Sequence, residues 1–385
     1  MPEAQPPSPL RLDLLGPVAV EHADLRIVEL PLRSPFTTSF GTQTVRRALL
    51  VECHGDGATG VGECAAGIEP AYSAETVTTA RDVLRHHLLP GVLGQPAATV
   101  ADQLQRVAWV RGHNMARAAL EMALLDLAGR ISGVSLGAVL GAASDRVGCG
   151  VSIGIQPSLD ATYALIDGYL AAGYRRIKLK CRPGYDVELA RGVRTRFPDA
   201  LVMLDANSAY RLEDLPVLHQ LDAFDLMMLE QPLAHDDLVD HAAVQAQLRT
   251  PICLDESVES VADARAAIQL RAGRIVNIKA GRVGGLIPAV AVHDVCRAAG
   301  WPVWCGGMLE TGVGRAANVA LAALPNFTLP GDTSASDRYF EADILTEPFQ
   351  LQPGGTLAVP TGPGLGVELD PARVAATTQH HERVG

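Results

Sequence analysis

Short apolar segments that end in a polar residue recur at a nearly constant interval through the middle of the chain. Their polar ends are Lys180, Asp205, Glu230, Asp255 and Lys279, and successive members lie 25, 25, 25 and 24 residues apart. Each segment is rich in Ile, Val, Leu and Met, which is typical of a strand buried on both faces. Several of the stretches between them begin at Asp or Ser and end at Gly, as helices do. The repeat therefore predicts parallel strands joined by crossover helices.

Two folds are built from such repeats, a doubly wound open sheet and a closed (β/α) barrel. The interval extends to seven successive units from about residue 147 to 323, and segment 327–331 can supply an eighth strand. The strand ends of a barrel converge on one mouth, where active sites lie, whereas an open sheet concentrates ligands at one switch point. Five polar strand ends in a row favour the barrel, so we predict an α/β fold, a (β/α)7β-type TIM barrel.

The chain before this repeat has a different pattern. Segments 23–32 and 46–64 alternate and turn as antiparallel strands do, and apolar residues follow helical spacing through 116–131. These features predict a smaller α+β capping domain. In chain order, we expect a flexible tail at 1–17, the capping domain at 18–145, the barrel at 146–340 and a segment returning to the capping domain at 341–385.

Composition argues against some classes of partner. The formal net charge of −11 disfavours nucleic acid, because no basic face offsets it. No uninterrupted apolar run reaches about 18 residues, so we expect no membrane span, and the proline-rich start lacks the basic region of a signal peptide. Seven dispersed cysteines without a C-x-x-C pair predict reduced thiols and a cytoplasmic location.

Lysine is rare here, and its positions are informative. Of the 32 lysines and arginines, only Lys178, Lys180 and Lys279 are lysines, and all three lie at the predicted strand ends. Arginine cannot lose its proton in a protein, whereas lysine can, so these positions suit acid–base chemistry. Lys178 and Lys180 point to the same side of one strand, and we expect each ammonium group to disfavour protonation of the other. Compositional drift is the alternative, but it explains only the scarcity of lysine.

Three carboxylates end successive strands, at Asp205, Glu230 and Asp255. Carboxylates converging on one point repel unless a cation joins them, and an all-oxygen donor set suits Mg²⁺ or Mn²⁺ better than zinc. The alternative is that each acid caps a separate helix, but the equal spacing favours a metal site. Lys180 and Lys279 would then flank this site from opposite sides. Such an arrangement suits α-proton removal from a metal-bound carboxylate substrate, followed by racemisation or elimination.

These residues stand in motifs that resemble those of the enolase superfamily, and most of all its muconate-lactonising subgroup. The matching barrel motifs are KLK (178–180), LDAN (204–207), EQP (230–232), LDES (254–257) and NIKAG (277–281). The matching capping-domain motifs are PFTTSFGT (35–42) and GVGECAAGIEPAY (60–72). The segment WCGGMLETGVGRAAN (304–318) is similar to that of o-succinylbenzoate synthases and N-succinylamino acid racemases.

The resemblance implies roles for the five strand-end residues. Asp205, Glu230 and Asp255 would bind Mg²⁺, which Mn²⁺ or another divalent cation can replace, and Lys180 and Lys279 would be the acid/base residues on the two faces of the substrate. In o-succinylbenzoate synthesis, a dehydration in menaquinone biosynthesis, Lys180 would act alone as the acid/base, and Lys279 would stabilise the enediolate as a cation. The alternatives are a dipeptide epimerase, a muconate-type cycloisomerase and a non-catalytic binding barrel.

The resemblance also implies a set of substrate contacts for a small-molecule carboxylate. They are Lys178, Asn207, Ser152, Arg282, Gly306, Gly307, Met308, Phe36 and Tyr72. Thr38 and Phe40 would lie with Phe36 in a lid over the mouth. Glu256, beside a metal ligand, has the simpler interpretation of a neighbouring polar contact. Barrels of this kind commonly assemble, so we expect a homo-oligomer.

Overall fold

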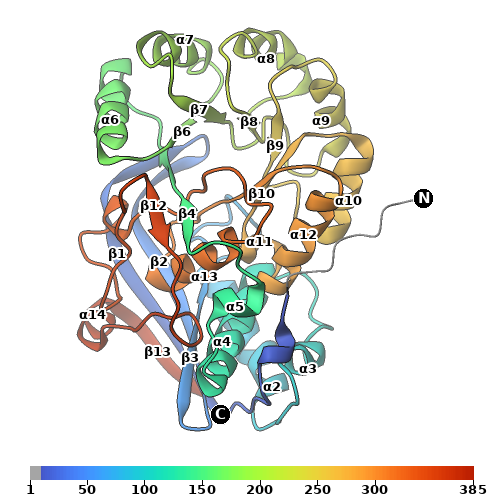
Figure 1. Ribbon diagram of the computed structural model, residues 1–385, viewed down its shortest axis with the longest axis vertical. Coiled ribbons are helices and arrows are strands. Elements are labelled where there is room, and N and C mark those ends of the chain that lie inside the picture. Colours follow the sequence, from blue (N-terminus) through green and yellow to red (C-terminus); the bar gives the residue numbers. More distant parts are fainter. Residues whose placement is uncertain (1–9) are drawn as a thin grey trace.

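Seven parallel strands form the central sheet of the computed structural model, which describes residues 10–385 (Figure 1). They are β5 (Gly150–Ile153), β6 (Arg176–Lys180), β7 (Leu201–Asp205), β8 (Leu229–Glu230), β9 (Ile252–Leu254), β10 (Ile275–Ile278) and β11 (Val303–Cys305). The strands lie side by side in chain order. The predicted barrel fold is therefore confirmed, with its polar residues at the carboxyl ends of neighbouring strands.

The predicted eighth strand, segment 327–331, is irregular. Phe327 forms a single parallel bridge to Val303 of β11, and Gly331 forms one to Cys149, next to β5. The Gly150 N–H donates to the Gly331 carbonyl at 2.7 Å. Pro330 has no N–H, and this interrupts a regular ladder. The segment thus closes the barrel between its first and last strands, but through bridges at its two ends.

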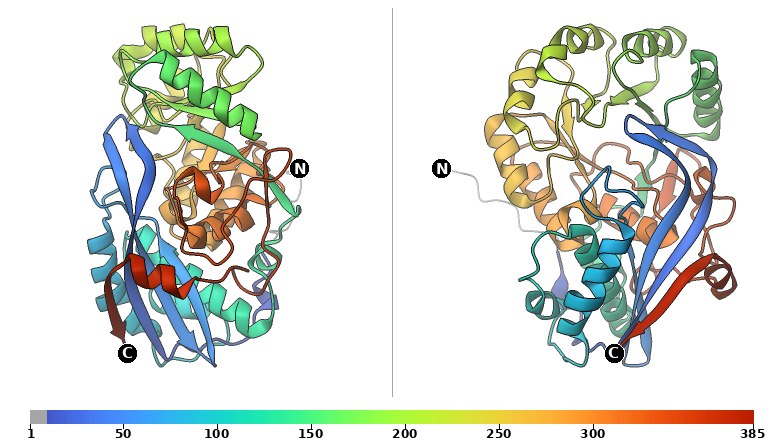
Figure 2. Two further views of the ribbon diagram at one scale, coloured as in Figure 1. Left: turned by 90° about the vertical axis from the view of Figure 1, so that its left-hand side faces the viewer. Right: turned by 180° about the vertical axis from the view of Figure 1, so that it is seen from behind.

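Helices surround the sheet on its outer side (Figures 1 and 2). They are α6 (Leu159–Ala172), α7 (Val187–Arg196), α8 (Leu215–Leu221), α9 (Leu238–Gln245), α10 (Val261–Leu270), α11 (Ala280–Val283), α12 (Leu286–Ala298) and α13 (Gly312–Ala322). Ser158 caps the start of α6 and Gly173 caps its end, as the sequence predicts. Ser260 caps the start of α10, but its end is capped by Arg271, which takes the left-handed conformation two residues before the predicted glycine.

The cap is a four-stranded antiparallel sheet in the order β13-β1-β2-β3. Its strands are β1 (His22–Thr38), β2 (Gly41–Gly55), β3 (Ala58–Cys64) and β13 (Thr378–Val384). Its helices are α1 (Val77–Val83), α2 (Leu89–Val92), α3 (Val100–Arg106), α4 (Asn114–Ser132) and α5 (Leu136–Leu140). Helix α4 packs so closely on β3 that a Cβ at Gly62 would lie 2.0 Å from the Ala119 carbonyl oxygen.

Both ends of the described chain lie on the cap side of the molecule. β13 pairs with β1 along its length, preceded by α14 (Pro371–Thr377), and a short pair joins β4 (Arg146–Gly148) to β12 (Thr356–Ala358). Residues 1–9 of the predicted tail lie outside the described residues. Residues 10–17 are packed instead of frayed, because the Arg11 N–H donates to Val139 and the Gly16 N–H donates to the Ser132 hydroxyl.

The hairpin of β1 and β2 extends from the cap across the mouth of the barrel (Figure 2). The Ile155 N–H, just after β5, donates to the Thr37 carbonyl at 2.9 Å, and the Ser39 hydroxyl donates to the Asn207 carbonyl at 3.3 Å. The predicted lid is therefore the tip of a regular hairpin and already touches two strand ends of the barrel.

Two further observations bear on predictions made from composition. All seven cysteines are free and buried. Within residues 10–385, every helix is too short or too polar to cross a membrane.

Candidate active site

A cavity of about 390 Å³ lies at the carboxyl ends of the barrel strands, beneath the β1–β2 hairpin. Most of the predicted site residues line it: Phe36, Tyr72, Ser152, Lys178, Lys180, Asn207, Lys279, Gly307 and Met308. Thr38 and Phe40 line it from the hairpin. Arg282 contacts Tyr72, a lining residue. A Cβ at Gly306 would lie 2.3 Å from Asn277 Oδ1 and 2.6 Å from the Lys279 Cε atom, so the absent side chain leaves room for both residues.

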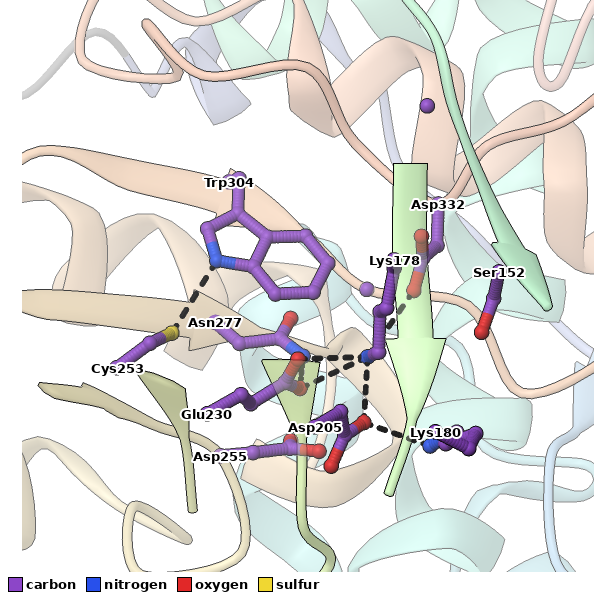
Figure 3. Close-up of polar contacts among 12 residues, drawn as sticks. Ser152, Lys178, Lys180, Asp205, Glu230, Cys253, Asp255, Asn277, Trp304 and Asp332 are labelled. Atoms are coloured by element: carbon purple, nitrogen blue, oxygen red, sulfur yellow. Dashed lines mark hydrogen bonds and ion pairs between the residues drawn. The ribbon is translucent and has the colours of Figure 1, made fainter. Parts of the chain in front are cut away.

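Lys178 is the most heavily paired cation of the site (Figure 3). Its Nζ lies 2.8 Å from Asp205 Oδ2, 2.7 Å from Glu230 Oε2 and 3.2 Å from Asp332 Oδ2. The Trp304 ring lies 4.9 Å from the same nitrogen, at a cation–π distance. Burial alone would lower the pKa of Lys178, but the charges of Asp205, Asp332 and Glu230 raise it above the ordinary value. Lys178 is therefore a fixed positive charge in this structure.

Lys180 shares a partner with Lys178. Its Nζ donates to Asp205 Oδ2 at 2.6 Å and to Asn207 Oδ1 at 2.7 Å. We expected the two ammonium groups to disfavour each other's protonation, but such repulsion does not lower the net pKa of Lys178. The carboxylates around Lys178 outweigh its repulsion by the neighbouring amines.

Lys279 lies in a different environment on the other side of the carboxylates. Its Nζ donates to Asp255 Oδ2 at 2.7 Å and to the Tyr72 hydroxyl at 3.1 Å, and it lies 4.4 Å from the centre of the Tyr72 ring. Arg282 contacts the other oxygen of Asp255 and donates to the Tyr72 hydroxyl at 3.2 Å. One carboxylate therefore holds two cations and a phenol together.

The three strand-end carboxylates are fully buried. Lys178 and Lys180 hold the pKa of Asp205 well below its usual range in spite of burial. The pKa of Glu230 is raised by its burial and by the charge of Asp205. Glu256, interpreted from sequence as a plain polar contact, joins this group through the Asn207 amide at 2.9 Å. Its Oε2 has no hydrogen-bond partner among the described residues.

This donor set fits a hard divalent cation. Oxygen ligands are what Mg²⁺ takes in proteins, and Asp205, Glu230 and Asp255 offer carboxylate oxygens alone. Lys178 bridges Asp205 and Glu230, and Lys279 occupies Asp255, so ammonium groups now neutralise the carboxylates. A metal ion would bind by taking over carboxylate oxygens from these lysines.

Asp205, Glu230 and Asp255, each paired with a lysine, do not bring their ligand atoms within 4.8 Å of one another in this structure. Among residues 10–385, the group of three that does so lies on the cap and consists of His22, Asp24 and His54. It fits an ion poorly. The two imidazole rings are stacked at 4.4 Å with 8° between their planes, so their in-plane lone pairs do not converge. Asp24 is also already paired with His381 at 3.0 Å and with Arg383 at 3.3 Å.

Sequence reasoning missed an ion pair that completes the inner wall of the site. Arg176 Nη1 lies 2.8 Å from Asp332 Oδ1, and both side chains are buried. The Arg176 guanidinium and Lys178 both contact the Trp304 ring, the former at 4.8 Å. A signal was present, because Arg176 stands two residues before Lys178 on one strand face. Asp332 likewise follows the closing segment directly, as the other acids follow their strands.

The comparisons with known proteins agree on one family. Residues 22–141 match the N-terminal domain of the mandelate racemase / muconate lactonizing enzyme family, and residues 162–373 match the enolase C-terminal domain-like family. The chain is 54% identical to an N-succinylamino acid racemase from Amycolatopsis over 89% of this chain and 93% of the relative. It is 50% identical to an o-succinylbenzoate synthase from Geobacillus kaustophilus over 94% of this chain and 96% of the relative. A crystal structure of an enolase superfamily member from Listeria innocua superimposes with a TM-score of 0.91, at 40% identity over 95% and 99% of the two chains.

Proposed function

Because this chain belongs to the mandelate racemase / muconate lactonizing enzyme family of the enolase superfamily, we propose that it removes the α-proton of a carboxylate substrate. The observation that carries the proposal is the order of side chains along adjacent strand ends. Lys180 ends β6 and Lys279 follows β10, with the three carboxylates on the strands between them. Both lysines line the same cavity, so a substrate held between them meets an amine on each side.

The substrate we propose is a dicarboxylate, either an N-succinylamino acid or the precursor of o-succinylbenzoate. The relatives named above support these two substrates. The cavity supports them as well, because Arg46 and Arg47 line it in addition to the three lysines that pair with Asp205, Glu230 and Asp255. Further cations of this kind suit the second carboxylate of such a substrate.

Asp205, Glu230 and Asp255 are the residues we propose to hold Mg²⁺, with Mn²⁺ as a substitute. When bound, the ion supplies positive charge beside the substrate carboxylate and so makes the α-proton more acidic. The chain supplies the proton transfer. In racemisation, Lys180 and Lys279 take and return the proton on opposite faces. The β1–β2 hairpin and Tyr72 cover the substrate and exclude water from it.

In the synthase reaction we propose that Lys180 alone moves the proton and Lys279 stays a cation. The pKa of Lys279 supports this role. Burial would lower it, but Tyr72, Glu256 and Glu230 together raise it above the ordinary value, which favours the charged form. A fixed positive charge at this place stabilises the negative charge that develops on the substrate.

Two further parts of the proposal concern the setting of the enzyme. A reducing cytoplasm suits the seven free cysteines, all of which are buried. Assembly into a homo-oligomer stays a prediction.

The proposal is tested by following α-proton exchange in D2O with ¹H NMR. Both enantiomers of an N-succinylamino acid are incubated with enzyme that holds Mg²⁺ and with chelator-treated enzyme, and the o-succinylbenzoate precursor is assayed in parallel. We expect exchange, racemisation and dehydration only with the metal. Metal-loaded enzyme that is inert on all these substrates would overturn the proposal. Turnover of dipeptides or muconate alone would instead identify an epimerase or a cycloisomerase.

A further inference from the structure

Helix α4 of the cap lies against the turn that carries Lys279 (Figure 1). Lys279 is the residue immediately before α11, and Gly284 and Gly285 join α11 to α12. The Gly285 N–H donates to the Ala280 carbonyl at 2.9 Å, and the Val283 N–H donates to the Lys279 carbonyl at 3.2 Å. These bonds make residues 279–285 one closed unit, so a shift of Gly285 is transmitted to Lys279.

Glu121 holds this unit at its glycine end. Helix α12 begins after Gly285, which has no side chain to cap the first turn. The cap comes from Glu121 of α4, whose Oε1 accepts from the Ile287 N–H at 2.8 Å. A Cβ at Gly285 would lie 2.3 Å from Glu121 Oε2, so the carboxylate sits directly on the glycine backbone. Glu121 is buried and interacts with Arg117 of its own helix.

Asn114 holds the same unit nearer to the site. Its Nδ2 donates to the Arg282 carbonyl at 2.8 Å and to the Glu259 carbonyl at 3.3 Å. Asn114 and Glu121 are seven residues apart, so they stand on one face of α4. That face therefore contacts the turn at Arg282 and again at Gly285 and the start of α12.

On the far side of the site, Lys180 is held differently. It ends β6, which pairs with β5 and β7, and its amine is placed by Asp205 and Asn207 on the neighbouring strand end. The hydrogen bonds that Asn114 and Glu121 of α4 make to the barrel thus lie on the Lys279 side.

We infer that Glu121 is a positioning residue for Lys279: a carboxylate of the cap sets the place of one of the two catalytic amines and leaves the other unaffected. This inference rests on the proposed two-face proton transfer. It predicts an effect that a general loss of stability does not produce, namely a change in the balance between the two faces of the substrate.

The experiment compares α-proton exchange of the two enantiomers of one N-succinylamino acid in D2O, using Mg²⁺-loaded full-length protein. In wild type, each enantiomer presents its proton to a different lysine. In Glu121→Ala we expect exchange of one enantiomer to slow about tenfold more than that of the other, because small misplacements of a catalytic group are costly. In Glu121→Gln the amide oxygen can still accept the Ile287 N–H, so the ratio should return to within about twofold of wild type.

Asp126 supplies a matched control on the same helix. It is buried, and it accepts the Val61 N–H at 2.8 Å and the Leu365 N–H at 2.7 Å, away from the Lys279 turn. Asp126→Ala should lower the melting temperature and leave the ratio of the two exchange rates unchanged. The inference is overturned if Glu121→Ala slows both enantiomers equally, or if Asp126→Ala shifts the ratio as much. If wild type itself exchanges neither enantiomer, the proposed function fails, which is a distinguishable result.

Discussion

The two sides of the barrel mouth place their catalytic amines by different means. Lys180 ends a regular strand, and its partners come from the next strand along the chain. Lys279 follows a strand but lies in a turn whose partners include Tyr72 from the cap and whose backbone is held by α4. One side is therefore built from local strand register, and the other from contacts between cap and barrel. The cap therefore does more than cover the substrate, since it also shapes one half of the site.

The largest expected effect is the loss of racemisation activity on substitution of Lys180 or Lys279, and it distinguishes the roles of the two lysines. Lys180→Ala and Lys279→Ala should each lower racemisation by about 10³-fold, as loss of a general acid–base does, while each keeps exchange of one enantiomer. Lys279→Arg sharpens the comparison because arginine keeps the charge but cannot act as a base. It should retain more dehydration than racemisation activity. Parallel steady-state assays check this, and equal losses of both activities in Lys279→Arg would contradict the assigned roles.

The next effect concerns the wall beside Lys178. Asp332→Ala leaves the buried guanidinium of Arg176 without its carboxylate partner, which should lower the free energy of unfolding by about 3 kcal/mol. Chemical denaturation measures it. Asp167→Ala is the control, because Asp167 pairs with Arg196 on the exposed surface and should change little. A similar small change in both variants would mean that the inner wall is not held by this ion pair.

A pH dependence distinguishes the α4 contact from the strand side. Burial raises the pKa of Glu121 to about 7, so the folded state holds this proton more tightly than the unfolded state. Its contribution to stability is complete below about pH 4.5 and is lost as pH rises to about 7, by up to roughly 3 kcal/mol. Glutamine does not titrate, so Glu121→Gln lacks this loss. Between pH 5 and pH 8 the free energy of unfolding should therefore fall more in wild type than in Glu121→Gln.

The contribution of Asp332, on the other side of the site, to the free energy of unfolding changes with pH in the opposite direction. Arg176 and Lys178 lower the pKa of this buried carboxyl to about 2. Its contribution is therefore complete above its ordinary pKa of about 4 and is lost only as pH falls toward 2. If the free energy of unfolding of wild type follows that of Glu121→Gln between pH 5 and 8, then Glu121 does not titrate in that range.

The smallest expected effect comes from a single hydroxyl. Tyr72→Phe keeps the ring beside Lys279 but removes the bonds of its hydroxyl to Lys279, Asp255 and Arg282. We expect about a tenfold slower exchange on the Lys279 face, equivalent to roughly 1.4 kcal/mol, and little change on the Lys180 face. Exchange of both enantiomers by NMR measures it, with Phe40→Leu at the hairpin tip as a control that should affect both faces alike.

Much of the barrel could be predicted from sequence because its strands and their polar ends are specified by a local, repeating pattern of residues. A strand of fixed period carries its side chains to alternate faces, so the repeat alone places Lys180, Asp205 and Glu230 at neighbouring strand ends. The closing segment was harder, since Pro330 interrupts the ladder and a short apolar run does not reveal this. The charge of Lys178 was harder to predict for a related reason: the pattern places Asp205 and Glu230 on neighbouring strand ends, but it does not reveal Asp332 or the pairing of all three carboxylates with this amine.

The order of the polar strand ends, and hence the kind of chemistry that they can perform, follows from the amino-acid sequence, because that order depends on repeat length and strand alternation. Three features depend on how distant segments pack in the folded chain: which cation pairs with which carboxylate, how Arg176 and Asp332 close the inner wall, and how α4 holds the turn of Lys279. Glu121 and Gly285 are 164 residues apart, and no local pattern encodes a contact that forms only when two separately built sheets pack together.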